Sequence, residues 1–223
     1  MKKYFKYLVA VIGICVIAGT AEARSGLGLR LSYDLTIPGD IKSPIGNFDT
    51  SSGSGVQFGV TYTYSIVAGL YVEPGVVFYY DTYRSDEITL GDESSTFMPA
   101  TIKPKVSKTG LRVPVMVGYQ IGIDGPVSRL YLYTGPEFSI GFKAKMKYDF
   151  PEDNDLKYEN NLYGSDAFYP YRRFTTSWAI GAAVDISAFN VGLTATIGMS
   201  DQIKTKNSSM KENSLRLTVG YNF

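Results

Sequence analysis

The sequence predicts an all-β chain in which eight antiparallel strands close into an up-and-down transmembrane β-barrel. Three observations predict this fold class. Apolar residues alternate with small or polar residues along most of the chain, which is the pattern of strands with two different faces. The second face is rich in Gly, Thr and Ser and poor in Lys, as suits a crowded barrel interior. The connections between strands are alternately long and short.

The start of the chain has the pattern of a secretory signal peptide. A lysine-rich beginning precedes an apolar stretch over 8–18, which is too short to cross a bilayer, and an A-x-A cleavage pattern occupies 21–23. We therefore expect a signal peptide over 1–23 and a barrel over 24–223.

Four alternating segments lie in the N-terminal half. In 27–37, Leu, Tyr and Ile alternate with Gly, Arg, Ser and Asp, and in 56–64, Val, Phe and Tyr alternate with Gln, Gly and Thr. In 70–80, apolar residues alternate with Tyr, Glu and Gly, and in 111–121, Leu, Val and Ile alternate with Arg, Met and Gly. Each segment is long enough for a tilted strand to cross a bilayer, which takes about 9–11 residues.

Four further segments follow in the C-terminal half. In 130–141, Leu, Phe and Ile alternate with Tyr, Gly and Glu, and in 178–186, Trp, Ile and Val alternate with Ala, Gly and Asp. In 189–199 and 215–223, large apolar residues alternate with Asn, Gly, Thr and Arg. Tyr, Phe and Trp gather towards the ends of the apolar faces, which predicts a lipid-facing band with aromatic girdles.

Three prolines fall inside these segments, at Pro74, Pro114 and Pro136. Proline lacks the backbone donor that a strand ladder needs, so we expect local bulges or kinks at these positions.

The connections predict which end of the barrel faces the cell exterior. The long ones are polar, and with a secreted N-terminus they fall outside, while the short ones fall in the periplasm. The long connections are 38–54, 84–107, 143–174 and 200–213, and the short ones are 65–69, 122–128 and 187–188.

The composition excludes several classes of function. The chain has no His, which removes His-based catalysis and His-ligated zinc, and one Cys, which removes disulfide frameworks. The net charge of +1 argues against a nucleic-acid binder. Known barrel enzymes rely on His, so we expect no enzyme, no cofactor and no metal site.

Several motifs resemble a known family. They are YVEPGV at 71–76, LRVPVMVGY at 111–119 and YLYTGPE at 131–137. They resemble the PorT-like outer-membrane β-barrel family of Bacteroidota, among the small OmpA/OmpX-like barrels, over the whole mature chain. The resemblance implies location in the outer membrane of a Gram-negative cell. The family is broad, so a role in secretion or gliding stays open.

The last segment also resembles the C-terminal insertion signal that the barrel-assembly machinery reads. The residues that carry this resemblance are Leu217, Val219, Tyr221 and Phe223. The same residues would form the last strand of the barrel, and the two interpretations are compatible.

The inward faces carry charges that must be paired inside a narrow barrel, because an unpaired buried charge is costly. We favour a structural salt-bridge core; a gate or polar conduit and an acid/base pair are the alternatives. Arg30 and Arg216 are expected at similar depth, since the first and last strands meet. The predicted lumen network is Arg30, Asp34, Glu73, Arg112, Glu137, Asp185 and Arg216.

The connection 143–174 is the best binding candidate, because aromatics beside charges suit glycan, peptide or protein contacts. The alternative is that these aromatics pack on each other and on the barrel rim. The candidate residues are Tyr158, Tyr163, Phe168, Tyr169, Tyr171, Arg172 and Arg173. The acidic run 152–155 lacks calcium-loop spacing and is interpreted as a solvated turn. Lys103, Lys105 and Lys108 could meet lipopolysaccharide phosphates or be plain loop charges.

These observations favour a non-enzymatic, integral outer-membrane barrel whose long extracellular loops bind a partner or serve another membrane system. The alternatives are a small porin-like channel with a charged lumen, and a periplasmic barrel that binds an apolar ligand. The expected partners are outer-membrane lipid and lipopolysaccharide, the barrel-assembly machinery, and a protein or glycan at the loops, with no nucleic acid.

Overall fold

The computed structural model describes residues 26–39, 41–43, 46–48, 51–67, 69–84, 88–90, 100–123, 129–149, 157–164, 170–205 and 209–223. The predicted signal peptide over 1–23, the acidic run 152–155, and the candidate residues Phe168 and Tyr169 lie outside these described residues.

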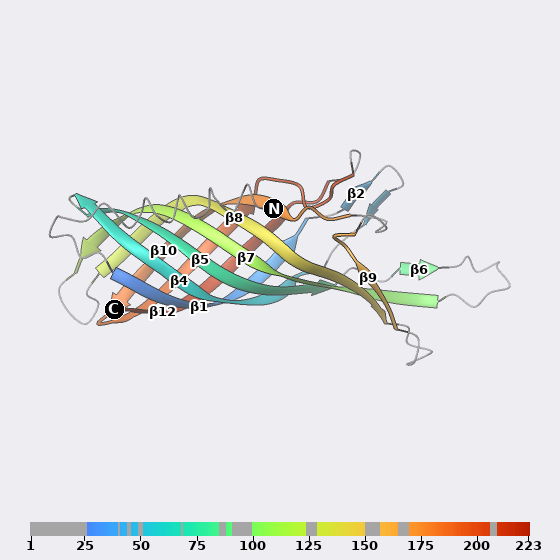
Figure 1. Cartoon of the computed structure of the whole chain (residues 1–223), viewed down its shortest axis with the longest axis horizontal. Coiled ribbons are helices and arrows are strands. Elements are labelled where there is room, and N and C mark those ends of the chain that lie inside the picture. The colour runs from blue at the N-terminus through green and yellow to red at the C-terminus, as the bar shows by residue number, and fades with distance from the viewer. Residues whose placement is uncertain are drawn as a thin grey trace.

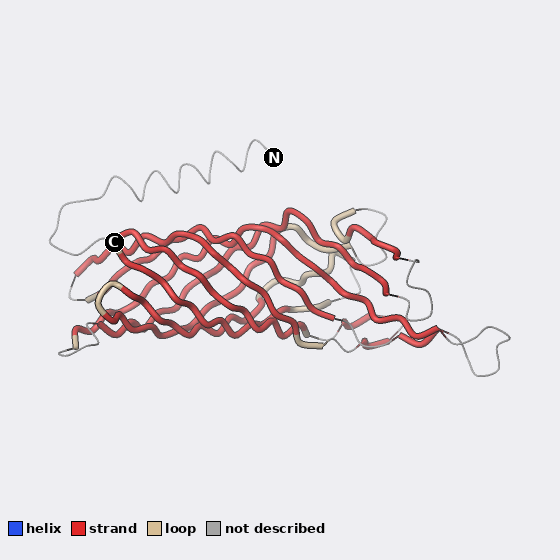
Figure 2. The backbone as a smooth tube through the Cα atoms, turned by 90° about the horizontal axis from the view of Figure 1, so that it is seen from below, coloured by secondary structure: helices blue, strands red, loops and turns tan. Residues whose placement is uncertain are grey.

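Eight long strands form a closed antiparallel barrel, as the alternation predicts (Figures 1 and 2). Consecutive strands pair around the wall, β7 pairs with β8, and β1 pairs with β12 to close the circle. The eight strands are β1 (Gly26–Pro38), β4 (Gly53–Val67), β5 (Leu70–Arg84), β7 (Ala100–Gly122), β8 (Arg129–Asp149), β10 (Phe174–Ile186), β11 (Phe189–Gly198) and β12 (Glu212–Asn222).

Four short strands lie outside the barrel circle. β2 (Ile41–Ser43) and β3 (Gly46–Phe48) pair with each other. β6 (Ile88–Leu90) pairs with the start of β7, and β9 (Lys157–Asn161) pairs with the end of β8.

The two ends of the barrel differ, and we call them the turn end and the loop end. The turn end holds the C-terminus and the strand ends that lead into the short connections from β4 to β5, from β7 to β8 and from β10 to β11 (Figure 1). Gly69 and Ser187 adopt positive φ angles of 87° and 60° there, which lets the chain reverse within a few residues. The loop end holds the long connections and, beyond the rest of the barrel, β6, β9 and the far ends of β7 and β8.

Two barrel strands extend well into connections that were predicted as loops. β7 begins at Ala100, inside the predicted connection 84–107, and β8 continues to Asp149, inside the predicted connection 143–174. The prediction missed these extensions because their outer face carries lysines rather than apolar residues, so the apolar alternation stops while the hydrogen-bonded pairing continues.

The prolines do not produce the bulges that we expected. The β5–β7 register is the same on both sides of Pro74, and the β7–β8 register is the same on both sides of Pro114 and Pro136. The register shifts lie elsewhere, between Ser65 and Val67 and between Thr109 and Gly110. Each proline therefore removes a backbone hydrogen-bond donor from the sheet without causing a bulge in its strand.

The barrel is apolar outside and polar inside. Outward side chains such as Leu31, Phe58 and Ile197 are about 60% exposed, whereas inward Asp34, Gln57 and Glu137 are at most 2% exposed. A soluble periplasmic barrel with an apolar ligand would need the opposite arrangement, so this alternative is wrong. The described part of the chain contains no helix that is long and apolar enough to cross a membrane.

Candidate functional site

The seven charged residues predicted for the lumen all lie inside the barrel, in two layers. The upper layer, nearer the loop end, is organised by Arg112 of β7. Its guanidinium forms ion pairs with Asp34 of β1 and Asp81 of β5, and its Nε lies 3.6 Å from Glu137 of β8. The same guanidinium stacks 4.3 Å from the ring centre of Tyr79. One side chain of β7 therefore contacts both neighbouring strands, β5 and β8, and reaches β1 across the lumen.

Arg216 of β12 completes the upper layer. Its Nε donates to Asp34 Oδ1 at 2.9 Å, and its two terminal nitrogens donate to the two oxygens of Glu137 at 2.8 and 3.0 Å. This bidentate pairing fixes both position and orientation of the carboxylate. Asp34 also accepts a hydrogen bond from Gln57 of β4.

The lower layer, nearer the turn end, is less compact. Arg30 donates to Asn222 Oδ1 at 2.8 Å and lies 3.5 Å from Glu73 Oε2. Asp185 accepts hydrogen bonds from Tyr131 and Asn190, both at 2.7 Å, and a third from Asn222 at 3.0 Å.

The expectation that Arg30 and Arg216 lie at similar depth is wrong. In the β1–β12 register Arg30 is opposite Gly220, and Arg216 is opposite Asp34. The two arginines therefore belong to different layers, because the stagger of the closing strands, which sets this register, is not visible in either strand alone.

Sequence reasoning missed four members of the upper region: Asp81, Gln57, Lys108 and Glu212. Asp81 and Lys108 continue the inward alternation of β5 and β7 just beyond the predicted strand ends. Lys108 pairs with Glu212 inside the barrel and is 4% exposed, so it is not available to lipopolysaccharide. Extending the alternation by a few residues at the loop end would have found these charges.

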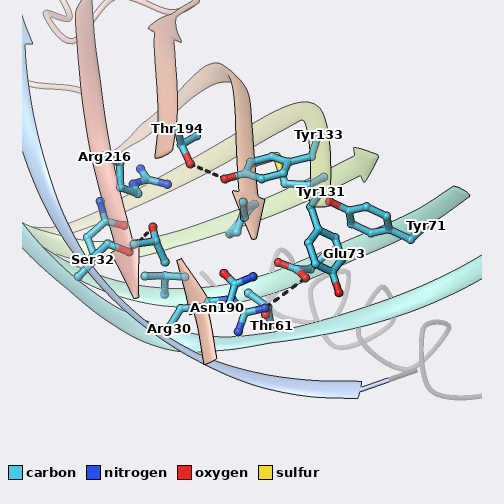
Figure 3. A pocket seen from close by; sticks show the side chains of 16 residues that line it. Arg30, Ser32, Thr61, Tyr71, Glu73, Tyr131, Tyr133, Asn190, Thr194 and Arg216 are labelled. Carbon is cyan, nitrogen blue, oxygen red and sulfur yellow. Dashed lines mark hydrogen bonds and ion pairs between the residues drawn. The ribbon is translucent and has the colours of Figure 1, made fainter. Parts of the chain in front are cut away.

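The space left between the layers is small. Figure 3 shows the side chains that line a cavity of about 80 Å³, among them Arg30, Glu73, Tyr131 and Arg216. A second cavity of about 30 Å³ is lined by Arg112, Glu137 and several Ser and Thr side chains. Both volumes fit a few waters and are far below the roughly 300–1,000 Å³ of small-molecule sites.

An apolar cluster lies at the loop end of the barrel. We call it the cap, and it joins the ends of three barrel strands to the segments that follow β9 and β11. Tyr83 Oη and Tyr171 Oη lie 2.6 Å apart at its centre, and backbone bonds tie the two segments together, including Arg172 N to Gln202 O at 2.7 Å. The cap residues are Tyr83, Val106, Ala144, Leu162, Tyr171, Ile203 and Met210.

Some candidate binding residues of connection 143–174 are packed in or against the cap, and others are exposed. Tyr171 is buried in the cap, and Tyr163 packs against the cap and fills the space beside Gly141. Arg172 and Arg173 have exposed side chains, which donate to the carbonyls of Ile203 and Phe142. Tyr158 lies in β9, and its side chain is outside the described set. Tyr163 and Tyr171 therefore agree with the alternative interpretation, in which these aromatics pack on each other and on the barrel rim, and not with an exposed binding surface.

The predicted insertion signal faces outward on β12. Leu217, Val219 and Tyr221 are between 41% and 52% exposed, and Phe223 beyond the strand end is 71% exposed. The rings of Tyr221 and Phe223 meet edge to face at 5.0 Å, at the turn end. This places an aromatic pair where a lipid-facing girdle is expected.

The chain is similar to several solved outer-membrane barrels. OprG from Pseudomonas aeruginosa is 12% identical, with a TM-score of 0.50 over 90% of this chain and 97% of that one. Neisserial surface protein A is 10% identical, with a TM-score of 0.44 over 88% and 97%. Ail of Yersinia pestis, solved with the heparin analogue sucrose octasulfate, is 11% identical, with a TM-score of 0.43 over 89% and 99%. At 12% identity the likeness to OprG shows the fold alone.

No curated protein matches the chain. The sequence does match one family, the outer membrane protein beta-barrel domain, over residues 7–223. That match covers nearly the whole chain and agrees with the closed barrel, the outward apolar band and the polar lumen. The chain therefore belongs to the outer membrane protein beta-barrel domain family and is an integral protein of the outer membrane.

Proposed function

We propose that this protein is a non-enzymatic, non-conducting barrel that acts through its extracellular end, by contact with a protein or glycan partner. One contrast carries the proposal. The lumen holds two charged layers, with the cap at its loop end, whereas β7 and β8 extend past the barrel and carry β9 outside it. The described part of the chain thus forms a surface that projects beyond the barrel, and it does not form an internal passage.

The absence of catalysis is supported by the chemistry of the lumen. Asp34 and Glu137 are held by arginines, and the two cavities are too small for a substrate. The chain has no His to act as a general base near neutral pH.

The element that best suits partner contact is the outer edge of β9. Within the described residues β9 pairs only with β8, so its other edge presents backbone donors and acceptors. Such an edge can accept an added strand from another chain.

The PorT-like resemblance adds a further proposal, that the partner belongs to a membrane system of the Bacteroidota cell envelope. The residues that carry the resemblance contribute directly to the lumen. Glu73, Arg112 and Glu137 come from the three motifs and supply three of the paired charges. This supports a shared barrel plan and leaves the identity of the partner to experiment.

Site-specific photo-cross-linking on intact cells tests the proposal. A photoreactive amino acid replaces Asn160 on β9, and a matched variant carries it at Ala188, a partly exposed residue of the β10–β11 turn at the other end. We expect a discrete cross-linked species from position 160 that position 188 does not give. No species from position 160, or the same species from both positions, would contradict the proposed contact.

A further inference from the structure

The outer face of the projecting sheet carries a row of cations that faces away from the lumen. Lys105 of β7 lies directly between Arg84 of β5 and Lys147 of β8 in the strand register. Lys143 and Lys145 lie on β8 at every second position before Lys147, so they share its face. We call the five residues Arg84, Lys105, Lys143, Lys145 and Lys147 the cationic face.

A bulge directs the three β8 lysines outward. Thr109 pairs with Lys143 while Gly110 pairs with Gly141, so Phe142 is an extra residue in β8. Before the bulge, odd-numbered residues such as Glu137 point into the lumen; after it, even-numbered Ala144 is fully buried in the cap. If Phe142 instead paired with Thr109 in regular alternation, Lys143, Lys145 and Lys147 would point into the barrel.

The cationic face has little counter-charge from its own chain. Among the described side chains, Glu159 of β9 is the acidic residue beside it, paired with Lys145 and 4.0 Å from Lys147. Like charges on directly opposed strand positions destabilise the pair, so an external anion would stabilise this sheet.

The cationic face begins where the lipid-facing band ends. Phe142 is 51% exposed and immediately precedes Lys143, and Phe174 on the neighbouring strand is 56% exposed. From Lys143 to Lys147 the strand rises roughly 10 Å, given about 3.4 Å per residue and a tilt near 40°. The cations therefore start at the depth where the headgroups of the outer leaflet meet the barrel wall.

We propose that the cationic face binds the phosphate groups of phosphorylated glycolipid headgroups in the outer leaflet. Charge complementarity and continuity with the lipid-facing band support a lipid occupant rather than a soluble one. Lysine ammonium groups bind phosphate oxygens as point charges with strong hydrogen bonds, and each such cation adds to affinity for an anionic lipid surface. This proposal stands apart from the partner contact at β9 and does not depend on it.

Native mass spectrometry of the full-length protein with lipid A and with dephosphorylated lipid A tests the proposal. The variant Lys143→Gln/Lys147→Gln removes two cations from the face. The control Lys204→Gln/Lys211→Gln removes two exposed cations from the β11–β12 connection at the same end. All proteins are first checked for the change in gel mobility on boiling that marks a closed barrel.

We expect the wild-type protein and the control to bind lipid A alike, and Lys143→Gln/Lys147→Gln to bind it roughly 30-fold more weakly. Dephosphorylated lipid A should bind all three proteins equally weakly. Equal losses in both double variants, or no preference for the phosphorylated lipid, would overturn the proposal. Displacement of lipid A by inorganic polyphosphate at equal phosphate concentration would also overturn it, since the face would then recognise a soluble anion.

Discussion

Arg216 of β12 forms ion pairs with carboxylates of two other strands, Asp34 of β1 and Glu137 of β8. Its removal would leave Asp34 with one arginine and Glu137 with only the 3.6 Å contact to Arg112. Breaking a buried pair from one side costs about 3–5 kcal/mol, since the remaining charge stays buried. We expect Arg216→Ala to lower the free energy of unfolding by about that amount, measured by urea unfolding in lipid vesicles with Trp178 fluorescence.

The matched control for Arg216→Ala is Lys204→Ala, which removes one exposed cation from the same end of the barrel. Its effect should stay within about 0.5 kcal/mol, as for most surface substitutions. If the two variants lose equal stability, the Arg216 ion pairs are not stabilising the barrel.

Gly141 is required where Tyr163 enters the barrel. A Cβ at this position would overlap the Tyr163 hydroxyl, so any larger residue must displace the segment that carries it. We expect Gly141→Val to release this segment and to make the exposed Arg172 and Arg173 faster sites of trypsin cleavage on intact cells. Adding Tyr163→Ala should restore the wild-type cleavage rate; acceleration that survives this second change would contradict the steric reason.

At the scale of the element, the bulge in β8 predicts different effects on refolding for two single-residue deletions in the same strand. Deleting Phe142 removes only the extra residue, and Lys143 still pairs with Thr109. Deleting Ile140 in a regular strand would instead bring Phe142 to the inward place of Gly141, against Tyr163. We expect the first variant to refold into a heat-modifiable barrel and the second to refold poorly, as measured by gel mobility; equal yields would contradict the bulge assignment.

The strands could be predicted from sequence because lipid and lumen impose opposite demands on alternate residues. All eight were found on this basis, while β7 and β8 were predicted too short, since the outer face of their extensions carries lysines and lacks the apolar half of the pattern. The lumen charges followed from the same alternation. Their partners did not, because Arg112 reaches Asp34 across the barrel, and that distance depends on stagger and closure.

At the scale of the whole molecule, the structure contrasts with the channel alternative. Two charged layers and the cap occupy the path through the barrel. We expect no stepwise conductance from the wild-type protein in planar lipid bilayers, since the paired charges of the described residues lie across the lumen and leave only small cavities beside them. A steady conductance that changes when Arg112 or Glu137 is neutralised would support the channel and contradict the closed lumen.

The seam between β1 and β12 has a consequence for how the barrel assembles. These strands are far apart along the chain, so their pairing closes the longest loop and should come late, leaving two open edges until then. Asp34 and Arg216 face each other across this seam. If the β1–β12 register shifted by one residue, Arg216 would point towards lipid. If it shifted by two residues, Arg216 would point into the lumen but would no longer lie opposite Asp34. A wrong register between β1 and β12 therefore leaves Asp34 and Arg216 without each other's charge, which makes it less stable than the correct register. The ion pair across the seam thus selects the correct closure of the barrel.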